Sequence, residues 1–228
     1  MEEPYSSQNW YKNAYSDTNV SADKGSLVFK VMHSFLELGI TGNPEDCILE
    51  IGGNRGEHVP FVRQPYSKYI ITDLRQLDPE EYSDLNDPRL EFRQADCHSL
   101  DFEENQFDRV IVTCVFHHLT DPSLAAREIL RVLKPGGKLT VLLPNDPGLF
   151  YRFARGLTTL RRAKKNKVYN QVQLAHAYEH RNHFLSLREI LLNIFSEHQI
   201  RMVSFPFGFR TYNLGFISRL EIIKVNRN

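Results

Sequence analysis

The sequence predicts an α/β fold with a mostly parallel sheet, and three observations support that prediction. Residues 47–58 open with a short apolar run that stops at an acid and then breaks into glycines, a pattern typical of a buried strand, a tight turn and the start of a helix. Further apolar runs recur along the chain, and some of them are followed closely by an acid. Between two such runs, residues 121–133 carry apolar side chains at helical spacing. Strands that alternate with helices in this way build parallel sheets.

The glycine-rich turn indicates a site for a small, nucleotide-like ligand. Open α/β sheets bind their ligands at the carboxyl ends of the strands, where this turn lies. A dinucleotide fingerprint, Gly-x-Gly-x-x-Gly, would need glycine where Asn54 and Glu57 stand, and a carboxylate at position 57 would repel a pyrophosphate. A phosphate-binding P-loop is excluded because no Gly-Lys-Ser or Gly-Lys-Thr follows. The chemistry that remains is an acid and a set of glycines: Glu50, Gly52, Gly53 and Gly56.

The later strands follow in order, with acids at two of their ends. Residues 68–73 form an apolar run that ends at Asp73, about twenty residues after the first strand, where an acid can bind ribose hydroxyls. Residues 90–96 alternate apolar and polar side chains, and Asp96 closes that stretch. The Lys-Pro-Gly-Gly of residues 134–137 is predicted to end the helix. Four later strands are predicted at residues 107–114, 138–143, 199–205 and 215–224.

Together these motifs resemble the class I S-adenosylmethionine (SAM) dependent methyltransferases. The first motif of that family is typically an acid, an apolar residue and then Gly-x-Gly-x-Gly, which Glu50, Gly52 and Gly56 match. Asn54 stands in place of the middle glycine, and asparagine tolerates the positive φ of such a turn. The resemblance covers roughly residues 45–145 and is close from the fourth strand to the fifth.

The resemblance implies a Rossmann-like fold, a seven-stranded, mostly parallel sheet flanked by helices with an antiparallel last strand. It also implies SAM as the cofactor and S-adenosylhomocysteine (SAH) as the product. Glu50 and the glycine turn would hold the methionine part, Asp73 the ribose and Asp96 the adenine. With their neighbours and two tyrosines of the N-terminal leader, the predicted cofactor-binding residues are Glu50, Gly52, Gly53, Asn54, Gly56, Asp73, Leu74, Asp96, Cys97, Cys114, Tyr11 and Tyr15.

The chain is predicted to consist of a leader and one domain. Residues 1–44 are expected to form an N-terminal lid segment and a helix at 25–38, because in the family such a segment commonly folds over the SAM pocket. Residues 45–228 are the predicted methyltransferase domain. Within that domain, residues 144–182 are too long for an ordinary connection and predict a substrate-side insertion, followed by a helix at 185–195.

Histidines supply the candidate catalytic groups. The sulfonium of SAM already makes its methyl group electrophilic, so the protein mainly has to align a nucleophile and exclude water. A hydroxyl acceptor also needs a general base. His117 and His118 come directly after the fourth predicted strand, at the position that faces the methyl donor in the family. The alternative is that they pack against the core or contact the cofactor.

The predicted insertion carries a second group of polar residues. His176 and His180 are four residues apart, as are Glu179 and His183, so a helix would place each pair on one face. Zinc requires three or four converging ligands, and no Cys or further close acid supplies them, so no metal is predicted. The residues assigned to substrate binding are His176, Tyr178, His180, Arg181 and His183. A polar helix edge facing solvent is the alternative.

Composition limits the partners. The 228 residues carry no net charge, which argues against a general nucleic-acid binder. Residues 152–167 nevertheless hold a run of Arg and Lys without an acid. The simplest explanation of this run is a solvated helix face. Otherwise it would suit a phosphorylated or nucleotide-linked substrate or a peripheral contact with a membrane. RNA fits least, because no stacking aromatics are interleaved with the basic residues.

Three cysteines without metal-type spacing predict free thiols. The absence of a membrane-length apolar run and of a signal peptide at the N-terminus predicts a cytoplasmic protein.

Two classes of function stay open from the sequence. The first is a SAM-dependent methyltransferase, an enzyme that methylates an O or N of a small metabolite such as a sugar, a nucleotide-linked intermediate or a lipid-type molecule. The second is a non-catalytic SAM-binding regulatory or scaffold protein. The acids Glu50, Asp73 and Asp96 favour the first. A protein or RNA methyltransferase is a further alternative, although the Asn/Asp-Pro-Pro-Tyr motif is absent after the fourth strand.

Overall fold

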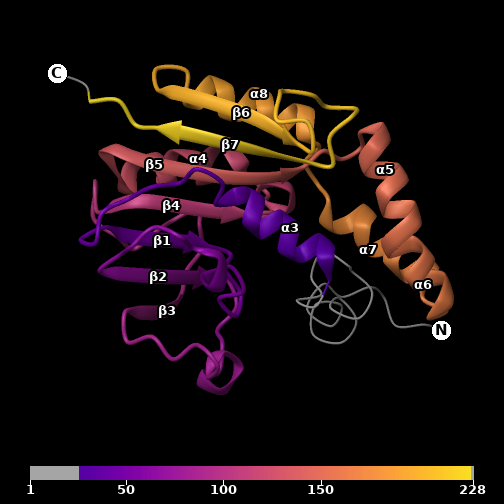
Figure 1. The fold of residues 1–228 in the computed structure, drawn as a ribbon, viewed down its shortest axis with the longest axis horizontal. Coiled ribbons are helices and arrows are strands. Elements are labelled where there is room, and N and C mark those ends of the chain that lie inside the picture. The colour runs from indigo at the N-terminus through magenta and orange to yellow at the C-terminus, as the bar shows by residue number, and fades with distance from the viewer. Residues whose placement is uncertain (1–25, 227–228) are drawn as a thin grey trace.

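The computed structural model describes residues 26–226 and contains one seven-stranded sheet. The strand order is β3-β2-β1-β4-β5-β7-β6 (Figure 1), with β1 to β5 mutually parallel and β7 antiparallel to both of its neighbours. The predicted Rossmann-like fold class is therefore confirmed. The strands are β1 (Cys47–Ile51), β2 (Lys68–Asp73), β3 (Leu90–Gln94), β4 (Phe107–Thr113), β5 (Leu133–Pro144), β6 (Gln199–Phe205) and β7 (Ile217–Ile223).

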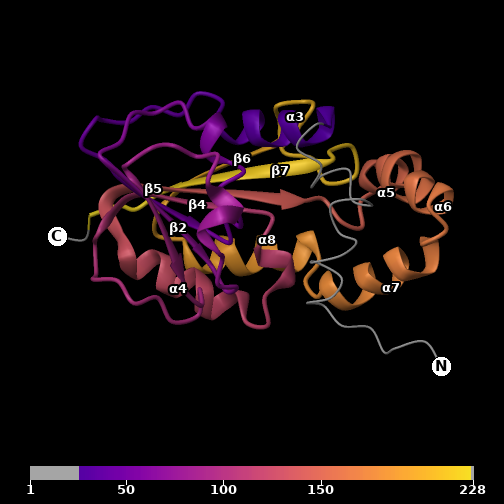
Figure 2. The same ribbon diagram turned by 90° about the horizontal axis from the view of Figure 1, so that it is seen from below.

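Helices cover both faces of the sheet and extend one end of it. α3 lies on one face and α4 and α8 on the other, whereas α5, α6 and α7 stand beyond the end of β5 (Figure 2). The α-helices are α3 (Leu27–Leu36), α4 (Pro122–Val132), α5 (Leu149–Arg155), α6 (Arg161–Lys165), α7 (Tyr169–Glu179) and α8 (Phe184–Ile194). Shorter turns are η1 (Val59–Phe61), η2 (Pro79–Tyr82), η3 (Phe116–His118) and the π-helical η4 (Gly156–Leu160).

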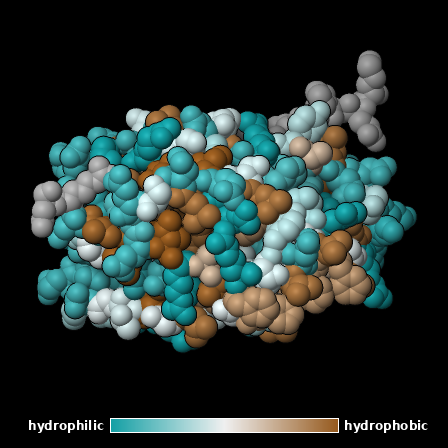
Figure 3. Space-filling model, turned by 90° about the horizontal axis from the view of Figure 1, so that it is seen from above, coloured by the Kyte–Doolittle hydropathy of each residue, from teal (hydrophilic) through white to brown (hydrophobic). Residues whose placement is uncertain are grey.

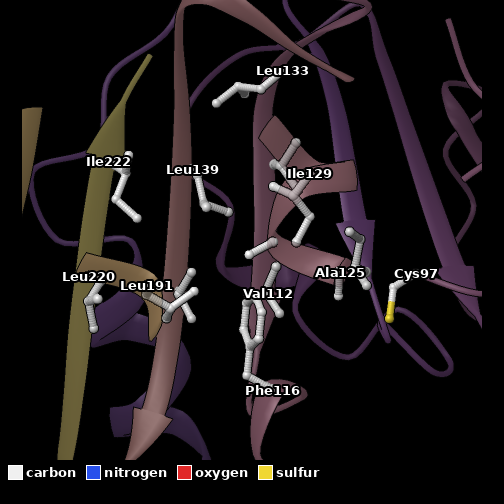
Figure 4. Close-up of a cluster of buried hydrophobic side chains, with 14 of the residues drawn as sticks. Cys97, Val112, Phe116, Ala125, Ile129, Leu133, Leu139, Leu191, Leu220 and Ile222 are labelled. Atoms are coloured by element: carbon white, nitrogen blue, oxygen red, sulfur yellow. The ribbon is translucent and has the colours of Figure 1, made fainter. Parts of the chain in front are cut away.

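The larger core lies between the sheet and the helices α4 and α8. Ile129 of α4 and Leu191 of α8 point toward Leu139 of β5, and all three side chains are buried (Figure 4). Burying one such side chain stabilises a fold by about 1.5–3 kcal/mol. This packing holds the parallel strands in register, and it fixes where their carboxyl ends lie.

A cap and a proline define the start of α4. The Oδ1 atom of Asp121 accepts hydrogen bonds from the backbone of Ser123 at 3.0 Å and Leu124 at 2.9 Å. Pro122 occupies the first helical position, where its missing N–H removes no helical hydrogen bond. The helix predicted at 121–133 is confirmed, with Asp121 as its cap.

The helix expected directly after the glycine turn is wrong. The connection from β1 to β2 forms turns and the short η1, which ends at Phe61. Pro60 and Pro65 both lie in this stretch, and proline in a helix interior removes a hydrogen bond and clashes with the preceding turn. His58 is also buried here, so the segment packs as an irregular layer against α3.

The fifth strand begins earlier than predicted. The segment expected as a helix end, residues 134–137, belongs to β5. Gly136 N–H donates to the Lys224 carbonyl at 2.7 Å, and Lys224 N–H donates to the Gly137 carbonyl at 3.0 Å. Gly136 adopts φ +78°, a left-handed conformation that glycine takes without strain. Residues 134–137 have the composition of a turn, but hydrogen bonding to the segment after β7 makes them part of a strand.

The remaining predicted elements are confirmed with small shifts at their ends. The helices predicted at 25–38 and 185–195 are α3 and α8, and the segment 144–182 contains α5, η4, α6 and α7. Among residues 26–226, no helix has the length and apolar character needed to cross a bilayer. The surface on the β6 side of the molecule, seen from above the view of Figure 1, carries both apolar and hydrophilic residues (Figure 3).

Candidate active site

The candidate site lies at the carboxyl edge of the parallel strands. The order β3-β2-β1-β4-β5 means that the chain leaves β1 toward one side of the sheet for β2 and β3 and toward the other side for β4 and β5. Open α/β sheets bind ligands at such a reversal point. The predicted site residues within the described part of the chain lie at or after the ends of these strands, or on α7 and in the four residues that follow it. Tyr11 and Tyr15 lie outside the described residues.

The turn after β1 requires its glycines. Gly52, Asn54 and Gly56 have φ values of +65°, +46° and +71°. A Cβ atom on Gly52 would lie 2.4 Å from Val115 Cγ2, closer than two carbon atoms can approach. The turn after β1 therefore packs directly against the segment after β4, and Asn54 adopts the positive φ expected of the replaced glycine.

Asp73 joins this turn to the end of β2. Its Oδ2 atom accepts a hydrogen bond from Asn54 N–H at 3.1 Å, and its Oδ1 atom accepts one from Arg75 N–H at 3.0 Å. The Arg75 guanidinium donates to Asn54 Oδ1 at 2.5 Å. Asp73 is half-buried and the neighbouring Leu74 is exposed, so this corner is both ordered and open to solvent.

Glu50 lies beneath the turn instead of at its open edge. The side chain is only 2% exposed and accepts a hydrogen bond from the Tyr69 hydroxyl at 2.8 Å. A Cβ atom on Gly53 would lie 2.8 Å from Glu50 Cδ, so the carboxyl group touches the underside of the turn. Burial raises the pKa of Glu50 to about 8, and the group is therefore mostly protonated at pH 7.

Asp96 occupies the corresponding position after β3. Its Oδ1 atom accepts from the His98 backbone at 2.9 Å and lies 2.7 Å from His98 Nδ1. These hydrogen bonds from His98 lower the pKa of Asp96, and the carboxylate remains exposed. Burial raises the pKa values of the Cys97 and Cys114 thiols to about 12, so both stay protonated and are poor nucleophiles.

His117 and His118 form the short turn η3 after β4. His117 is buried, its Nδ1 atom has no hydrogen-bond partner among the described residues, and burial lowers its pKa well below the usual value. His118 Nδ1 lies 2.9 Å from the Glu179 carbonyl, and burial lowers the His118 pKa to about 4. Both imidazoles are therefore neutral at pH 7 and can accept a proton or donate a lone pair to a ligand.

Three further residues complete what we call the histidine cluster: His117, His118, His176, His180 and Asp146. Asp146 follows β5, and its Oδ2 atom lies 2.9 Å from His180 Nδ1 and 3.0 Å from His176 Nε2. The His180 ring stacks on His176 with centroids 4.0 Å apart and lies 4.5 Å from the His117 ring. Hydrogen bonding to the two histidines outweighs the effect of burial and lowers the Asp146 pKa below its usual range.

The other predicted substrate residues lie outside this cluster. Tyr178, Arg181 and His183 are exposed on the surface near the end of α7. Asp146 was missed by the sequence reasoning, although its signal was present: Asn-Asp-Pro follows the fifth apolar run directly, at the same edge as the other acids. The structure thus brings together only part of the predicted insertion group, His176 and His180, with the histidines after β4.

Comparison with known proteins identifies the architecture. Residues 49–141 match the model of a family described as a methyltransferase domain. This part of the chain is therefore similar in sequence to a methyltransferase domain. The match runs from β1 to β5 and so includes the strand ends described above.

Sequence relatives share this methyltransferase core only. The chain is 47% identical over 115 residues to a ubiquinone/menaquinone biosynthesis C-methyltransferase UbiE of Pseudomonas savastanoi pv. phaseolicola, covering 47% of this chain and 44% of the relative. A UbiE of Hahella chejuensis is 35% identical over 112 residues, covering 44% and 43%. The chain thus matches less than half the length of these curated relatives.

Solved structures share the fold of the methyltransferase domain over nearly the whole chain. The plantazolicin methyltransferase BpumL, in complex with a monoazolic desmethylPZN analog and SAH, superposes with a TM-score of 0.67 at 12% identity, covering 96% of this chain and 94% of that one. Phosphoethanolamine N-methyltransferase 2 of Haemonchus contortus, in complex with SAM, gives 0.63 at 14% identity, covering 99% and 61%.

The residues at this edge fit the chemistry of SAM. Carboxylates at the ends of adjacent strands, Asp73 and Asp96, suit hydroxyl and amine donors, and both reach the surface. The left-handed conformation of Gly52 and Gly56 lets the turn pack closely on Val115 and Leu85, which fixes its backbone at the edge of the sheet. This edge therefore offers hydrogen-bond acceptors for the hydroxyl and amine groups of a nucleoside.

Proposed function

We propose that this chain is an enzyme that transfers the methyl group of SAM to an oxygen or nitrogen of a small molecule. The observation that supports this most strongly is the pair of neutral imidazoles, His117 and His118, next to the glycine turn. The turn packs on Val115, two residues before His117. A methyl donor above the turn and a proton acceptor after β4 would then share one edge of the sheet.

In this proposal the loops hold the cofactor as the family resemblance implies. The turn at residues 52–56 would bind the methionine part, Asp73 the ribose and Asp96 the adenine, with Leu74, Cys97 and Cys114 beside them. Glu50 would act indirectly, by holding the turn from below through its contact with Gly53. SAM supplies an electrophilic methyl group when it is bound.

The histidines would act on the acceptor. A hydroxyl loses its proton as its oxygen is methylated, and a neutral imidazole within reach can accept that proton, although the lowered pKa values of His117 and His118 make both of them weak bases. His117 and His118 hold no proton on one ring nitrogen each at pH 7. His176 and His180, at the end of α7, would orient the acceptor beside them, and exposed Arg181 and Tyr178 would contact its outer part.

A lipid-type acceptor, reached from a membrane surface, is favoured over a sugar by the surface of α5 and η4. Leu149, Phe153 and Leu157 are spaced four residues apart, and their exposed fractions are 66%, 60% and 55%. An apolar stripe flanked by Arg and Lys is typical of a helix that lies in the interface of an anionic membrane. The basic residues on this segment and on α6 directly after it are Arg152, Arg155, Arg161, Arg162, Lys164, Lys165 and Lys167. The names of the UbiE relatives, which concern quinone biosynthesis, point the same way.

Deuterium-labelled SAM tests the proposal. The full chain is incubated with SAM carrying a CD3 group and with candidate acceptors: hydroxylated lipid-type quinols, sugar nucleotides and simple amines. Mass spectrometry should find a product heavier by one CD3 group in place of hydrogen, together with SAH. SAH formation without a labelled product, or no SAH with any acceptor, would count against an active transferase.

A further inference from the structure

The histidine cluster contains more ligand groups than proton transfer to one acceptor needs. His176 of α7 and His180, which caps that helix, contact the single carboxylate of Asp146. The His117 and His118 rings of η3 lie against the His180 ring, with centroids 4.5 and 5.5 Å away. One ligand atom each from His117, His118 and His180 lies within 4.8 Å of the other two. A second group with the same spacing consists of Asp146, His176 and His180. Imidazole is the ligand that zinc, copper, iron and nickel share in proteins, whereas magnesium and calcium prefer oxygen.

The tautomers of two of these histidines suit a metal ion. His118 Nδ1 donates to the Glu179 carbonyl, and His180 Nδ1 donates to Asp146 Oδ2. A neutral imidazole with its proton on Nδ1 carries its lone pair on Nε2. Metal-bound histidines almost always have this arrangement, in which the outer N–H is held by a carboxylate or a backbone carbonyl.

The third histidine presents a buried nitrogen without a partner. His117 is 5% exposed, and no described residue forms a hydrogen bond with its Nδ1 atom. Buried polar atoms are nearly always paired, so an unpaired one calls for an explanation. The His117 ring lies against the rings of both His118 and His180, with centroids 3.9 and 4.5 Å away. A ligand bound by all three rings would give the His117 Nδ1 atom a partner. If the His117 ring is flipped, the Nε2 atom would bind that ligand instead.

We propose that His117, His118 and His180 bind one divalent transition-metal ion of the zinc type. At Zn–N distances of 2.0–2.1 Å, neighbouring nitrogens around a tetrahedral ion are about 3.4 Å apart. The present spacing of up to 4.8 Å therefore needs movements of about 1 Å per ring, which side-chain rotations provide. The second group fits less well, because an ion there would compete with the hydrogen bond from His180 to Asp146.

Asp146 and the fourth position have separate roles in this site. Asp146 orients His180 through its Nδ1 proton without touching the ion. Three protein ligands leave one open position, which is the arrangement of catalytic rather than structural zinc. With the ion bound, the coordinating nitrogens of His117 and His118 cannot accept a proton, and an acceptor hydroxyl would instead lose its proton more readily by binding at the open position. Only this last role depends on the proposed methyl transfer. The sequence predicted no metal because no Cys or further close acid accompanies His176 and His180. The structure brings these two close to His117, His118 and Asp146, which lie far away along the chain.

Cobalt and zinc titrations of the full chain test the site. After dialysis against a chelator, Co2+ should bind at one ion per chain with the intense visible absorption of a four-coordinate ion, and Zn2+ should displace it. His180→Ala should weaken Zn2+ binding at least a hundredfold. Asp146→Asn should weaken it tenfold to a hundredfold, because such partners of metal-bound histidines typically have effects of that size.

His198→Ala provides the matched control. His198 precedes β6, at the opposite edge of the sheet, and should leave the affinity for Zn2+ unchanged. Thermal unfolding identifies any variant that fails to fold. In that case the site is tested by the wild-type titration alone, through its stoichiometry of one ion per chain and the absorption of four-coordinate Co2+. The site would be overturned if the wild type bound Zn2+ no more tightly than a folded His180→Ala variant. It would also be overturned if His198→Ala weakened Zn2+ binding as much as His180→Ala does. Calorimetry with SAM on the same samples separates this result from a failure of the methyltransferase proposal.

Discussion

The Arg109 guanidinium forms a buried ion pair with the Glu37 carboxylate, with Nη2 2.6 Å from Oε1. Arg109 belongs to β4, and Glu37 caps the carboxyl end of α3, so this pair fastens the helix to the sheet. The Arg109 Nη1 atom also donates to Gln64 Oε1 at 3.1 Å, and His58 Nε2 lies 2.9 Å from Glu37 Oε1. A polar network therefore fills the space where the segment after the glycine turn meets α3.

Removing one member of this pair should destabilise the protein strongly. In Glu37→Ala the Arg109 charge stays buried without a partner, and breaking such a pair typically costs about 3–5 kcal/mol of unfolding free energy. Chemical denaturation measures the change. Glu45→Ala removes an exposed carboxylate nearby in the chain and should alter stability by less than about 0.5 kcal/mol. Equal effects of the two substitutions would show that the network contributes little.

The same network should make the protein sensitive to acid. His33 of α3 joins the network, with its Nδ1 atom 2.8 Å from His58 Nδ1. Burial lowers the pKa of His33 from 6.5 to about 3, so its contribution to stability is complete above pH 6.5 and is lost as the pH falls toward 3. Burial raises the pKa of Glu37, but hydrogen bonds from His58 and Arg109 bring it from 4.5 down to about 2, and its stabilisation is lost between those values.

Stability should fall by about 1.4 kcal/mol per pH unit for each of these groups inside its window. Urea unfolding between pH 7.5 and pH 4 measures this slope for His33, whose window begins at pH 6.5. His33→Phe, which keeps an aromatic ring stacked near Phe61, should flatten the dependence below pH 6.5. An unchanged slope in His33→Phe would show that other groups cause the acid sensitivity.

Gly52 should tolerate no side chain. In Gly52→Ala the residue would keep φ at +65° and place its Cβ against Val115, so we expect a loss of at least about 1–2 kcal/mol in stability together with weaker SAM binding. Thermal unfolding and calorimetry measure both. The control is Gly156→Ala, a helical glycine with nothing within 4 Å of the added Cβ, which should be neutral or slightly stabilising. A Gly52→Ala variant as stable as the wild type would contradict the packing described here.

Local patterns predicted most of the fold and only part of the site. The strands that end at Asp73 and near Asp96 were recognised because apolar runs stop abruptly at acids. The helix expected after the glycine turn failed because Pro60 and the burial of His58 favour irregular packing, which periodicity does not reveal. The contact between His117 and His180 joins residues on different elements, so no spacing along the chain could indicate it.

The apolar stripe on α5 and η4 should direct the chain to anionic membranes. Sedimentation with phosphatidylglycerol vesicles should recover the protein, phosphatidylcholine vesicles should not, and salt should weaken the binding. Phe153→Ser with Leu157→Ser should reduce binding at least tenfold, because each removes roughly 1.5–3 kcal/mol of apolar burial. Leu124→Ser, a comparably exposed leucine of α4, should have no effect. Equal recovery with both vesicle types would exclude an electrostatic membrane contact.

Calorimetric titration with SAM, SAH and NAD tests the central claim most directly. The wild-type chain should bind SAM and SAH in the micromolar range and should not bind NAD, because Glu57 stands where a pyrophosphate would need glycine. Asp73→Ala should remain folded and bind SAM about 10–100 times more weakly, the usual loss when a charged hydrogen-bond acceptor is removed. Failure of the wild type to bind either sulfur nucleotide, or an affinity for SAM unchanged in Asp73→Ala, would contradict the site described here.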